Sequence, residues 1–444
     1  MKKICAGLLL CSSFLSAQKW DSLGSGTQGG VAGEVFALTQ YDSNLVAGGF
    51  FELAGGIFTR VGIGQWNGTN WDTIGYTTSI KYVPEDVWAE GVYNNILFVA
   101  GLDMPEFVVA QWNGVAWDSV RPTQSQLYNL DNMEIKALTP YQGKLYVGGS
   151  NIITWDGTNW DSLPTGLIRN TSSFTIYAME VYNNKLYVGG SFDSIGNVPA
   201  KNIAVWNGTN WAAVGGGINN DVSSFCIYNG ILMVGGGFDS AGSIKASHIA
   251  GWNGSSWSAL GTGINDSGGV ACLAVYGSVL SVGGGFDSAG GVPANNIAFW
   301  DGTNWSALGS GITGNSTNVN ALFNYKGVLI AGGIFDSAGG IPVNNIAQWT
   351  SPLGINKLTN NNECTIFPNP STGIFTIALV GAQNFVPATA EIYNILGEKV
   401  FSQFTIHNSP FTINLSSQPN GLYFYRVLKE DGSLLGEGKV VIKK

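Results

Sequence analysis

The sequence predicts an all-β protein: a seven-bladed β-propeller closed by its N-terminal strand, followed by a small Ig-like β-sandwich. Three observations predict this fold class. A tryptophan pair recurs along most of the chain, two complementary half-copies flank the series, and the last eighty residues change to alternating short strands. The composition agrees, because 63 of the 444 residues are glycine and only 11% are charged, as expected for many tight turns and few solvated helices.

Each tryptophan pair encloses four residues, such as Asn-Gly-Thr-Asn or Asp-Gly-Thr-Asn, which favour a tight turn. Successive pairs begin 43 to 51 residues apart. Repeats of this length indicate propellers or solenoids rather than one globular core. The complete pairs are Trp66 and Trp71, Trp112 and Trp117, Trp155 and Trp160, Trp206 and Trp211, Trp252 and Trp257, and Trp300 and Trp305.

The two half-copies decide between a propeller and a solenoid. Trp20 has only the downstream part of the motif, and Trp349 has only the upstream part. If the strand at Trp20 pairs with the strand at Trp349, the ring closes and no sheet edge is left exposed. A solenoid would instead carry atypical capping repeats. The sequence therefore predicts a closed seven-bladed ring over residues 18–350.

Each repeat contains four apolar runs of strand length separated by turn residues. The first run reads Val/Ile-x-small-x-x-x-Tyr, the second ends in Gly-Gly, the third ends at the first tryptophan and the fourth starts at the second. Small residues in register predict that the first run is the innermost strand, where the blades converge. These small residues are Ala37, Ala89, Ala137, Ala178, Ser224, Cys272 and Ala321.

The connections sort onto two faces of the predicted ring. Those between the first and second runs, and between the third and fourth, are short and lie at one end of each blade. The other connections are mostly long and lie at the opposite end. Because binding surfaces are more often built from variable loops on a rigid scaffold, we expect any ligand on the long-loop face.

The repeat resembles the kelch repeat of kelch-type and galactose-oxidase-type propellers over residues 20–349. The resemblance lies in the Gly-Gly doublet that closes an apolar strand and in the aromatic and Trp residues that follow it. It implies the architecture and not an activity, because propellers host many functions. Copper-tyrosyl oxidation would need several His ligands, and this chain has only His248 and His407.

The N-terminus has the pattern of a secretory signal peptide over residues 1–17. Two lysines precede an apolar run that ends at Leu15, and Ser16-Ala17-Gln18 follows. We expect cleavage between Ala17 and Gln18. The run is too short for a transmembrane helix, and no later segment is long and apolar enough to be one. A lipoprotein at Cys11 is the less favoured alternative, because the preceding Leu10 is not small.

The C-terminal region, residues 365–444, follows a polar linker over residues 351–364. Alternating strands between turns predict a small β-sandwich. Four motifs, at 367–373, 390–400, 415–423 and 438–444, closely resemble the type A C-terminal sorting domain of the type IX secretion system. The resemblance implies contact with the secretion machinery and export through the periplasm to the surface of a Gram-negative bacterium, with the protein either released or anchored there. An ordinary C-terminal β-domain is the alternative.

Catalytic and metal-binding patterns are weak in this sequence. A net charge of −9 argues against nucleic-acid binding. With two histidines we predict no metal site, no cofactor and no catalytic residue. A lone aspartate in each long loop is better explained as a turn former than as a calcium ligand; these are Asp193, Asp239, Asp287 and Asp336. Cys226 and Cys272 could form a disulfide, although packed thiols are favoured.

The position just before each small residue suggests a binding site. In the first four repeats it holds Phe36, Trp88, Lys136 and Tyr177, whereas the last three have Ser223, Ala271 and Asn320. Aromatic faces beside a cation suit sugars or aromatic ligands. Glu90 stands where the other repeats have large apolar residues, and it joins this candidate set. A freely varying, solvated position is the alternative.

The sequence therefore predicts a secreted binding module that acts as a monomer and binds a glycan or a surface protein. Two alternatives stay open. The first is a surface glycoside hydrolase or lyase that uses arginines of the long loops and nearby acids; these are Arg60, Arg121, Arg169, Glu85, Asp86, Glu90, Asp131 and Glu134. The second is a structural surface protein without a specific ligand.

Overall fold

The computed structural model describes residues 19–24, 31–59, 61–75, 83–103, 106–120, 135–163, 174–265, 268–314, 316–350, 364–379, 388–394, 399–406, 411–429 and 434–444. The chain divides into two compact units, one spanning Ser16–Pro352 and the other containing Leu353–Lys444. Each unit is described by itself. No helix long and apolar enough to cross a membrane occurs in the described ranges.

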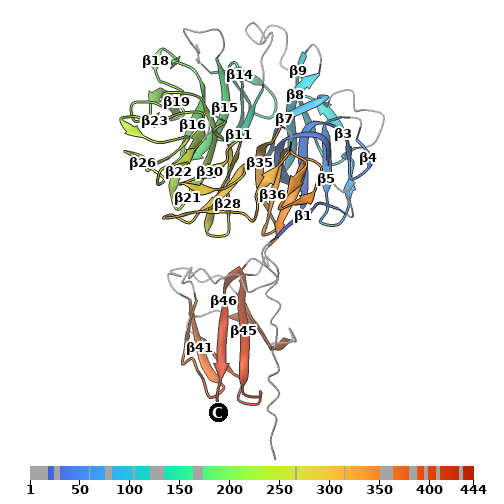
Figure 1. Cartoon of the computed structure of the whole chain (residues 1–444). Helices are drawn as coiled ribbons and strands as arrows, with labels where there is room; N and C mark the ends of the chain where they lie inside the picture. Colours follow the sequence, from blue (N-terminus) through green and yellow to red (C-terminus); the bar gives the residue numbers. More distant parts are fainter. Residues whose placement is uncertain are drawn as a thin grey trace, which may run out of the picture. The chain divides into compact units, whose positions relative to one another are not determined.

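The described part of the first unit contains seven main sheets, which we call blades one to seven (Figure 1). Blade one has β2 (Val31–Tyr41), β3 (Asn44–Ala54), β5 (Ile63–Trp66) and β6 (Trp71–Asp72), with β4 (Ile57–Phe58) added to β3. Blade two has β7 (Asp86–Tyr93), β8 (Ile96–Asp103), β9 (Glu106–Trp112) and β10 (Trp117–Ser119). Blade three has β11 (Ala137–Tyr141), β12 (Lys144–Gly148), β13 (Ile152–Trp155) and β14 (Trp160–Ser162).

The remaining blades repeat this order. Blade four has β15 (Thr175–Tyr182), β16 (Lys185–Ser191), β19 (Ile203–Trp206) and β20 (Trp211–Ala213). Blade five has β21 (Val222–Tyr228), β22 (Ile231–Gly236), β25 (Ile249–Trp252) and β26 (Trp257–Ala259). Blade six has β28 (Val270–Tyr276), β29 (Val279–Gly284), β32 (Ile297–Trp300) and β33 (Trp305–Ala307). Blade seven has β35 (Asn318–Tyr325), β36 (Val328–Ile334), β39 (Ile346–Thr350) and β1 (Lys19–Ser22).

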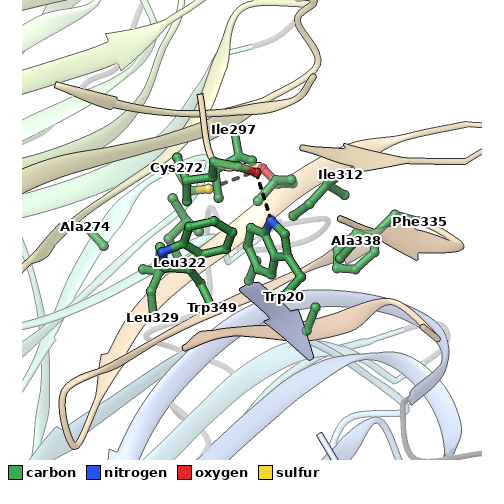
Figure 2. Packing of buried hydrophobic residues seen from close by; sticks show 14 of the residues in the cluster. Trp20, Cys272, Ala274, Ile297, Ile312, Leu322, Leu329, Phe335, Ala338 and Trp349 are labelled. Carbon is green, nitrogen blue, oxygen red and sulfur yellow. Dashed lines mark hydrogen bonds between the residues drawn. The ribbon is translucent and has the colours of Figure 1, made fainter. Parts of the chain in front are cut away.

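The first strands of the blades contact one another in ring order, and β35 of blade seven contacts β2 of blade one. The N-terminal strand closes this ring, because β1 pairs antiparallel with β39 and places Trp20 opposite Trp349. Their ring centroids are 5.3 Å apart (Figure 2). Trp20 Nε1 also donates to the carbonyl of Leu308, 3.1 Å away in blade six. The predicted all-β propeller, closed by its first strand, is confirmed.

The repeated tryptophans join neighbouring blades. Within a pair the two residues lie opposite each other across a hairpin, with ring centroids 5.7 Å apart for Trp66 and Trp71 and 4.9 Å apart for Trp252 and Trp257. The indole of the second tryptophan donates to a carbonyl just after the outer strand of the preceding blade. These bonds run from Trp71 to Leu23, Trp117 to Ile74, Trp257 to Gly215 and Trp305 to Leu260.

The tyrosine that ends the first strand makes a second contact between blades. Its hydroxyl donates to a carbonyl in the first turn of the next blade, as Tyr182 does to Gly230 at 2.9 Å. Tyr325 of blade seven donates in the same way to Ser43 of blade one at 2.9 Å. Tyrosines at the ring centre and tryptophans at the rim therefore hold adjacent blades together, which gives a physical reason for their recurrence.

The Gly-Gly doublet has two separate causes. A Cβ on the second glycine would collide with the blade's own backbone, as Gly101 would with the carbonyl of Asp86 and Gly284 with that of Gly269. A Cβ on the first glycine would meet side chains of the next blade, as Gly48 would with Val87. Blade two keeps the second glycine and has Ala100 in place of the first, so only the second position is dictated by backbone approach.

The long-loop face carries small hairpins built from the Phe-Asp-Ser loops. These are β17 (Ser194–Ile195) with β18 (Val198–Pro199), β23 (Ser240–Ala241) with β24 (Ile244–Lys245), β30 (Ser288–Ala289) with β31 (Val292–Pro293), and β37 (Ser337–Ala338) with β38 (Ile341–Pro342). The arriving strands β27 (Ile264–Asn265) and β34 (Ile312–Thr313) pair with β30 and β37. In each hairpin the backbone carbonyl of the loop aspartate accepts a hydrogen bond from the backbone N–H that follows the second short strand. For example, the Asp287 carbonyl accepts from Ala294 N–H at 2.8 Å.

The second unit consists of two antiparallel sheets. One has β40 (Cys364–Phe367), β41 (Ile374–Leu379) and β44 (Phe411–Asn414); the other has β43 (Lys399–Ile406), β42 (Ala388–Tyr393), β45 (Gly421–Lys429) and β46 (Leu434–Ile442). A single apolar core contains side chains of both sheets, including Phe375, Ile377, Ile392 and Val440. Residues 1–17, Gln18 and the linker residues 351–363 lie outside the described ranges, so the leader and linker stay predictions.

Candidate functional site

The residues just before the small positions, which we call the mouth residues, occupy a β-bulge at the start of each innermost strand. The pairing register shifts between Val35 and Ala37 in blade one, and the same shift occurs in blades two, four, five, six and seven. The extra residue in each shift is the one that precedes the small position. A bulge redirects its residue out of the regular ladder and often stands beside a functional site. The sequence shows the variable position, but not that it is a bulge.

Phe36, Trp88, Lys136 and Tyr177 therefore lie at equivalent places on four consecutive blades. All four are half-buried. In blade three, Lys136 N–H donates to the carbonyl of Gly148 at 2.9 Å, while Gly148 is also the register partner of Ala137. Lys136 and Ala137 thus lie opposite the single residue Gly148, as two residues lie opposite one at the other bulges. The structure brings the four predicted residues into one sector of the ring.

Trp88 and Lys136 are in direct contact. The ammonium of Lys136 lies 3.3 Å from the centroid of the Trp88 ring. Such a cation is attracted to the negative face of the indole, and the attraction grows when water is excluded. The contact links the bulges of blades two and three, and it places a hydrogen-bond donor with a positive charge on an aromatic surface.

Glu90 lies in the seam between blades one and two. Its Oε1 lies against Gly48 of β3, within an apolar slot that also contains Val87 and Val99. Part of the residue is exposed, but both carboxylate oxygens are buried and have no hydrogen-bond partner among the described residues. Burial raises the pKa of Glu90 well above its ordinary value. Its counterparts in blades four to seven, Met179, Phe225, Leu273 and Leu322, fill the equivalent slots.

The opposite sector of the ring has a different chemistry. The Asn320 amide donates to Oε1 of Glu34 at 2.9 Å and accepts from Asn318 at 2.6 Å. In blade five, Ser224 Oγ accepts from the backbone N–H of Leu273 at 3.1 Å. These short polar groups bridge neighbouring innermost strands. No comparable aromatic and cation pair occurs at the described bulges of blades five to seven.

Of the residues considered for catalysis, only Glu85, Asp86 and Glu90 lie in the described ranges, in or directly before β7. Arg60, Arg121, Arg169, Asp131 and Glu134 lie outside the described residues. Burial, followed by the charge of Glu85, raises the pKa of Asp86. Within the described ranges no three His, Cys, Asp or Glu side chains gather as a metal site. Cys226 and Cys272 are both free thiols, and burial raises the pKa of Cys226 to about 12.

His248 has a structural explanation that the sequence did not reveal. Its φ is 64°, and it occupies the place of Asn202, Asn296 and Asn345, whose φ angles are 59°, 63° and 61°. Asparagine is the side chain that most readily accepts this left-handed conformation apart from glycine. Like these asparagines, His248 stands just before the third strand of its blade. Its backbone N–H donates to the carbonyl of Phe238 at 2.7 Å. The fourfold recurrence of this position explains the histidine without catalysis.

In the second unit, motifs that are distant in sequence meet through hydrogen bonds. The Asn369 side chain donates to Lys439 O and accepts from Val441 N–H, at 3.0 and 2.9 Å. Lys444 Nζ donates to the carbonyls of Ser416 and Gln418, at 2.5 and 2.7 Å. Sequence comparison of the motifs gives their order, whereas only the fold shows that they assemble along one edge.

A buried carboxylate organises the four-stranded sheet of the same unit. Glu391 accepts from Lys399 Nζ, Arg426 Nε and the Tyr393 hydroxyl, at 2.5, 2.5 and 2.7 Å. Its side chain is only 8% exposed. The bond from Lys399, and then those from Tyr393 and Arg426, hold the pKa of Glu391 at about 2. The motif at 390–400 therefore supplies both the acid and one of its cationic partners.

Comparison with protein families decides the role of this unit. Residues 365–443 match the family described as the secretion system C-terminal sorting domain. The unit is a sorting domain. The protein is therefore exported by type IX secretion to the cell surface or the extracellular space, and the sorting domain interacts with that machinery. No characterised protein matches the chain by sequence.

Solved structures show the fold of the rest. The chain is similar to the extracellular domain of the putative one component system BT4673 from B. thetaiotaomicron, with a TM-score of 0.53 and 12% identity over 94% of this chain and 52% of that one. The chain thus spans about half the length of that protein. A weaker likeness, with a TM-score of 0.36 and 13% identity over 93% of this chain and 66% of the other, connects it to PorZ, a surface component of the type-IX secretion system of Porphyromonas gingivalis. At 12% identity the likeness to the BT4673 domain shows the fold alone.

Proposed function

We propose that the propeller is a non-catalytic binding module that presents its long-loop mouth to a glycan or a surface protein. The observation that carries this proposal is the set of bulges on blades one to four. They hold three aromatic residues and a lysine, and the Lys136 ammonium lies 3.3 Å from the Trp88 ring centroid. Elsewhere in the ring the same bulges hold only small or short polar residues.

The chemistry of this sector suits a ligand with both a flat apolar face and a polar or acidic group. Aromatic rings supply large contact areas at little cost in conformational entropy. The Lys136 ammonium offers donors to hydroxyl or carboxylate oxygens beside that surface. Glu90 belongs to the same strand as Trp88, β7, and completes the proposed set of binding residues.

The proposal includes three further points. The repeats are of the kelch-like type, the mature chain begins at Gln18 after cleavage at Ala17, and the mature protein acts as a monomer. Domain limits of 18–350 for the propeller and 365–444 for the sorting domain follow from the repeats and the motifs. A hydrolase or lyase on this scaffold and a structural protein without a ligand are the outcomes that the experiment must separate from binding.

The test is a glycan and protein array probed with the full chain, followed by titration of any retained ligand. Trp88→Ala should weaken binding about tenfold, because the lost aromatic contact supplies about 1–2 kcal/mol. Ala271→Trp on the opposite side should leave affinity unchanged. Equal losses in both variants would contradict the proposed site. Turnover of a retained glycan that is lost in Glu90→Gln would favour the enzyme, and retention of nothing would favour the structural protein.

A further inference from the structure

Blade one carries a cluster of exposed apolar side chains that its sister blades lack. In the described part of the propeller seven large hydrophobic side chains are exposed, and four of them fall within residues 50–58. These are Phe50, Leu53, Ile57 and Phe58, with exposures of 62%, 39%, 39% and 47%. We call them the blade-one hairpin patch. Concentrated exposed apolar surface of this kind marks an interaction site.

The patch lies on a hairpin whose backbone pairing matches that of the short hairpins in blades four to seven. Leu53 is the register partner of Phe58, just as Ser288 is the partner of Pro293 in blade six. Gly55 packs on Trp71 as Gly290 packs on Trp305. Thr59 N–H donates to the carbonyl of Glu52 at 2.8 Å, which repeats the hairpin closure by the loop aspartates. The hairpin therefore does not need large apolar side chains in order to fold.

The hairpins of blades four to seven show which residues this backbone accepts in place of the large apolar ones. At the position of Leu53 they have Ser194, Ser240, Ser288 and Ser337; at that of Phe58 they have Pro199, Lys245, Pro293 and Pro342; and at that of Phe50 they have Ser191, Gly237, Gly285 and Ile334. Leu53 and Phe58 are cross-strand neighbours, so their side chains lie side by side on one face. Blade one thus replaces polar or small pairs with an apolar pair open to solvent.

The charges around the patch indicate its occupant. The chain as a whole is acidic, with a net charge of −9. Glu52 is exposed on β3 between Phe50 and Leu53, and Asp72 is exposed on the outer strand of the same blade. Complementary charge favours the encounter and selects the partner. A second copy of this acidic chain is disfavoured, because it would bring like charges together.

We propose that the blade-one hairpin patch binds a segment of another protein that carries both large apolar and basic side chains. The apolar side chains of that segment cover Leu53, Phe58 and Phe50, and a basic side chain pairs with Glu52. None of the mouth residues Phe36, Trp88, Lys136 and Tyr177 takes part, so this surface is a second site on the protein. A surface-exposed protein would use it to hold a neighbouring protein at the cell envelope.

The test uses the full chain and three labelled ten-residue peptides, measured by fluorescence anisotropy. In the first, leucine alternates with lysine; in the second, leucine alternates with glutamate; and in the third, serine alternates with lysine. The leucine–lysine peptide should bind at least tenfold more tightly than either control, because only it has both features. Equal binding of the leucine–lysine and serine–lysine peptides would show a purely electrostatic effect and overturn the proposal.

The matched protein variant combines Phe50→Ser, Leu53→Ser and Phe58→Pro, which are the residues of blade four. It should keep the melting temperature of the parent and lose at least tenfold in affinity for the leucine–lysine peptide. If the triple variant does not fold, hydrogen exchange of the parent with and without peptide decides the matter, with new protection expected at residues 50–58. Protection elsewhere, undiminished binding by the variant, or a parent dimer that the variant abolishes would each contradict the proposed occupant.

Discussion

Blades two and six have the same four main strands but differ in side chains near the ring centre. Blade two has Trp88, Glu90 and Ala100, where blade six has Ala271, Leu273 and Gly283. Both keep the bulge, the second glycine of the doublet and the rim tryptophan that donates to the preceding blade. The ring therefore fixes the residues that join blades, and it leaves the bulge side chain free to vary.

This difference separates residues that maintain the fold from residues available for binding. Trp117 in blade two and Trp305 in blade six make the same bond to a carbonyl of the blade before, at 2.8 and 3.0 Å. Trp88 lies at a bulge rather than at the rim, and its ring meets Lys136 of the next blade. An aromatic residue at a rim position is thus structural, whereas one at a bulge distinguishes one sector from another.

The largest expected effect concerns the ring to which both blades belong. Deleting residues 18–24 removes β1, exposes the edge of β39 and leaves Trp349 without its partner. Truncation of one buried tryptophan alone costs about 3–5 kcal/mol, so the deletion should lower the free energy of unfolding by about 5 kcal/mol or more. Urea denaturation measures the loss. An unchanged midpoint would show that pairing of β1 with β39 does not hold the ring closed.

The next effect tests whether the two blades need the same glycine. Gly101→Ala and Gly284→Ala should each cost about 3 kcal/mol, because the new Cβ meets a backbone carbonyl that cannot move aside easily. Ala100→Gly in blade two should cost less than about 1 kcal/mol. Thermal unfolding of the three variants measures these losses of stability. A small cost for Gly101→Ala with a large one for Gly284→Ala would mean that the blades differ in backbone as well as in side chains.

A smaller effect comes from the acid in the blade two seam. Glu90→Leu, which copies Leu273, should stabilise the protein by about 1–3 kcal/mol at neutral pH, because it removes a buried polar group without a partner. The pKa of Glu90 is raised in the folded state. Between its ordinary value and the raised one, the unfolded chain releases a proton that the folded chain keeps, so stability falls as pH rises.

The pH dependence provides the control for this variant. The parent should lose stability from about pH 5 upwards, whereas Glu90→Leu should show a flatter profile over the same range. Leu273→Glu should introduce the steeper profile into blade six. Identical profiles for the parent and Glu90→Leu would mean that Glu90 is ionised and solvated in the folded protein, contrary to its burial between β3 and β7.

Much of the fold could be predicted from local patterns in the sequence. The half-motifs at Trp20 and Trp349 correctly predicted the pairing of β1 with β39, because complementary strands of a repeat must meet to close a ring. The bonds from Tyr325 to Ser43 and from Trp305 to Leu260 could not be predicted. They join different repeats, and a pattern within one repeat contains no information on which carbonyl of its neighbour lies within reach.

The candidate site was predictable as a set of positions and not as a geometry. The series Phe36, Trp88, Lys136 and Tyr177 is visible in the aligned repeats, but the bulge that redirects these residues is a property of strand pairing. The contact of Lys136 with Trp88 joins two blades, and the orientation of Glu90 toward Gly48 depends on the blade before it. Both are tertiary facts, which explains why residue type alone did not reveal them.

The most direct test of the division between fold and binding replaces the mouth residues with those of the opposite sector. A variant combining Phe36→Ser, Trp88→Ala, Lys136→Asn and Tyr177→Ser should be examined on one sample by urea unfolding and by titration with the ligand found on the array. The account predicts a free energy of unfolding within about 2 kcal/mol of the parent and a loss of affinity of at least a hundredfold. Retained affinity, or a protein that no longer folds, would show that the bulge residues serve the ring and not a ligand.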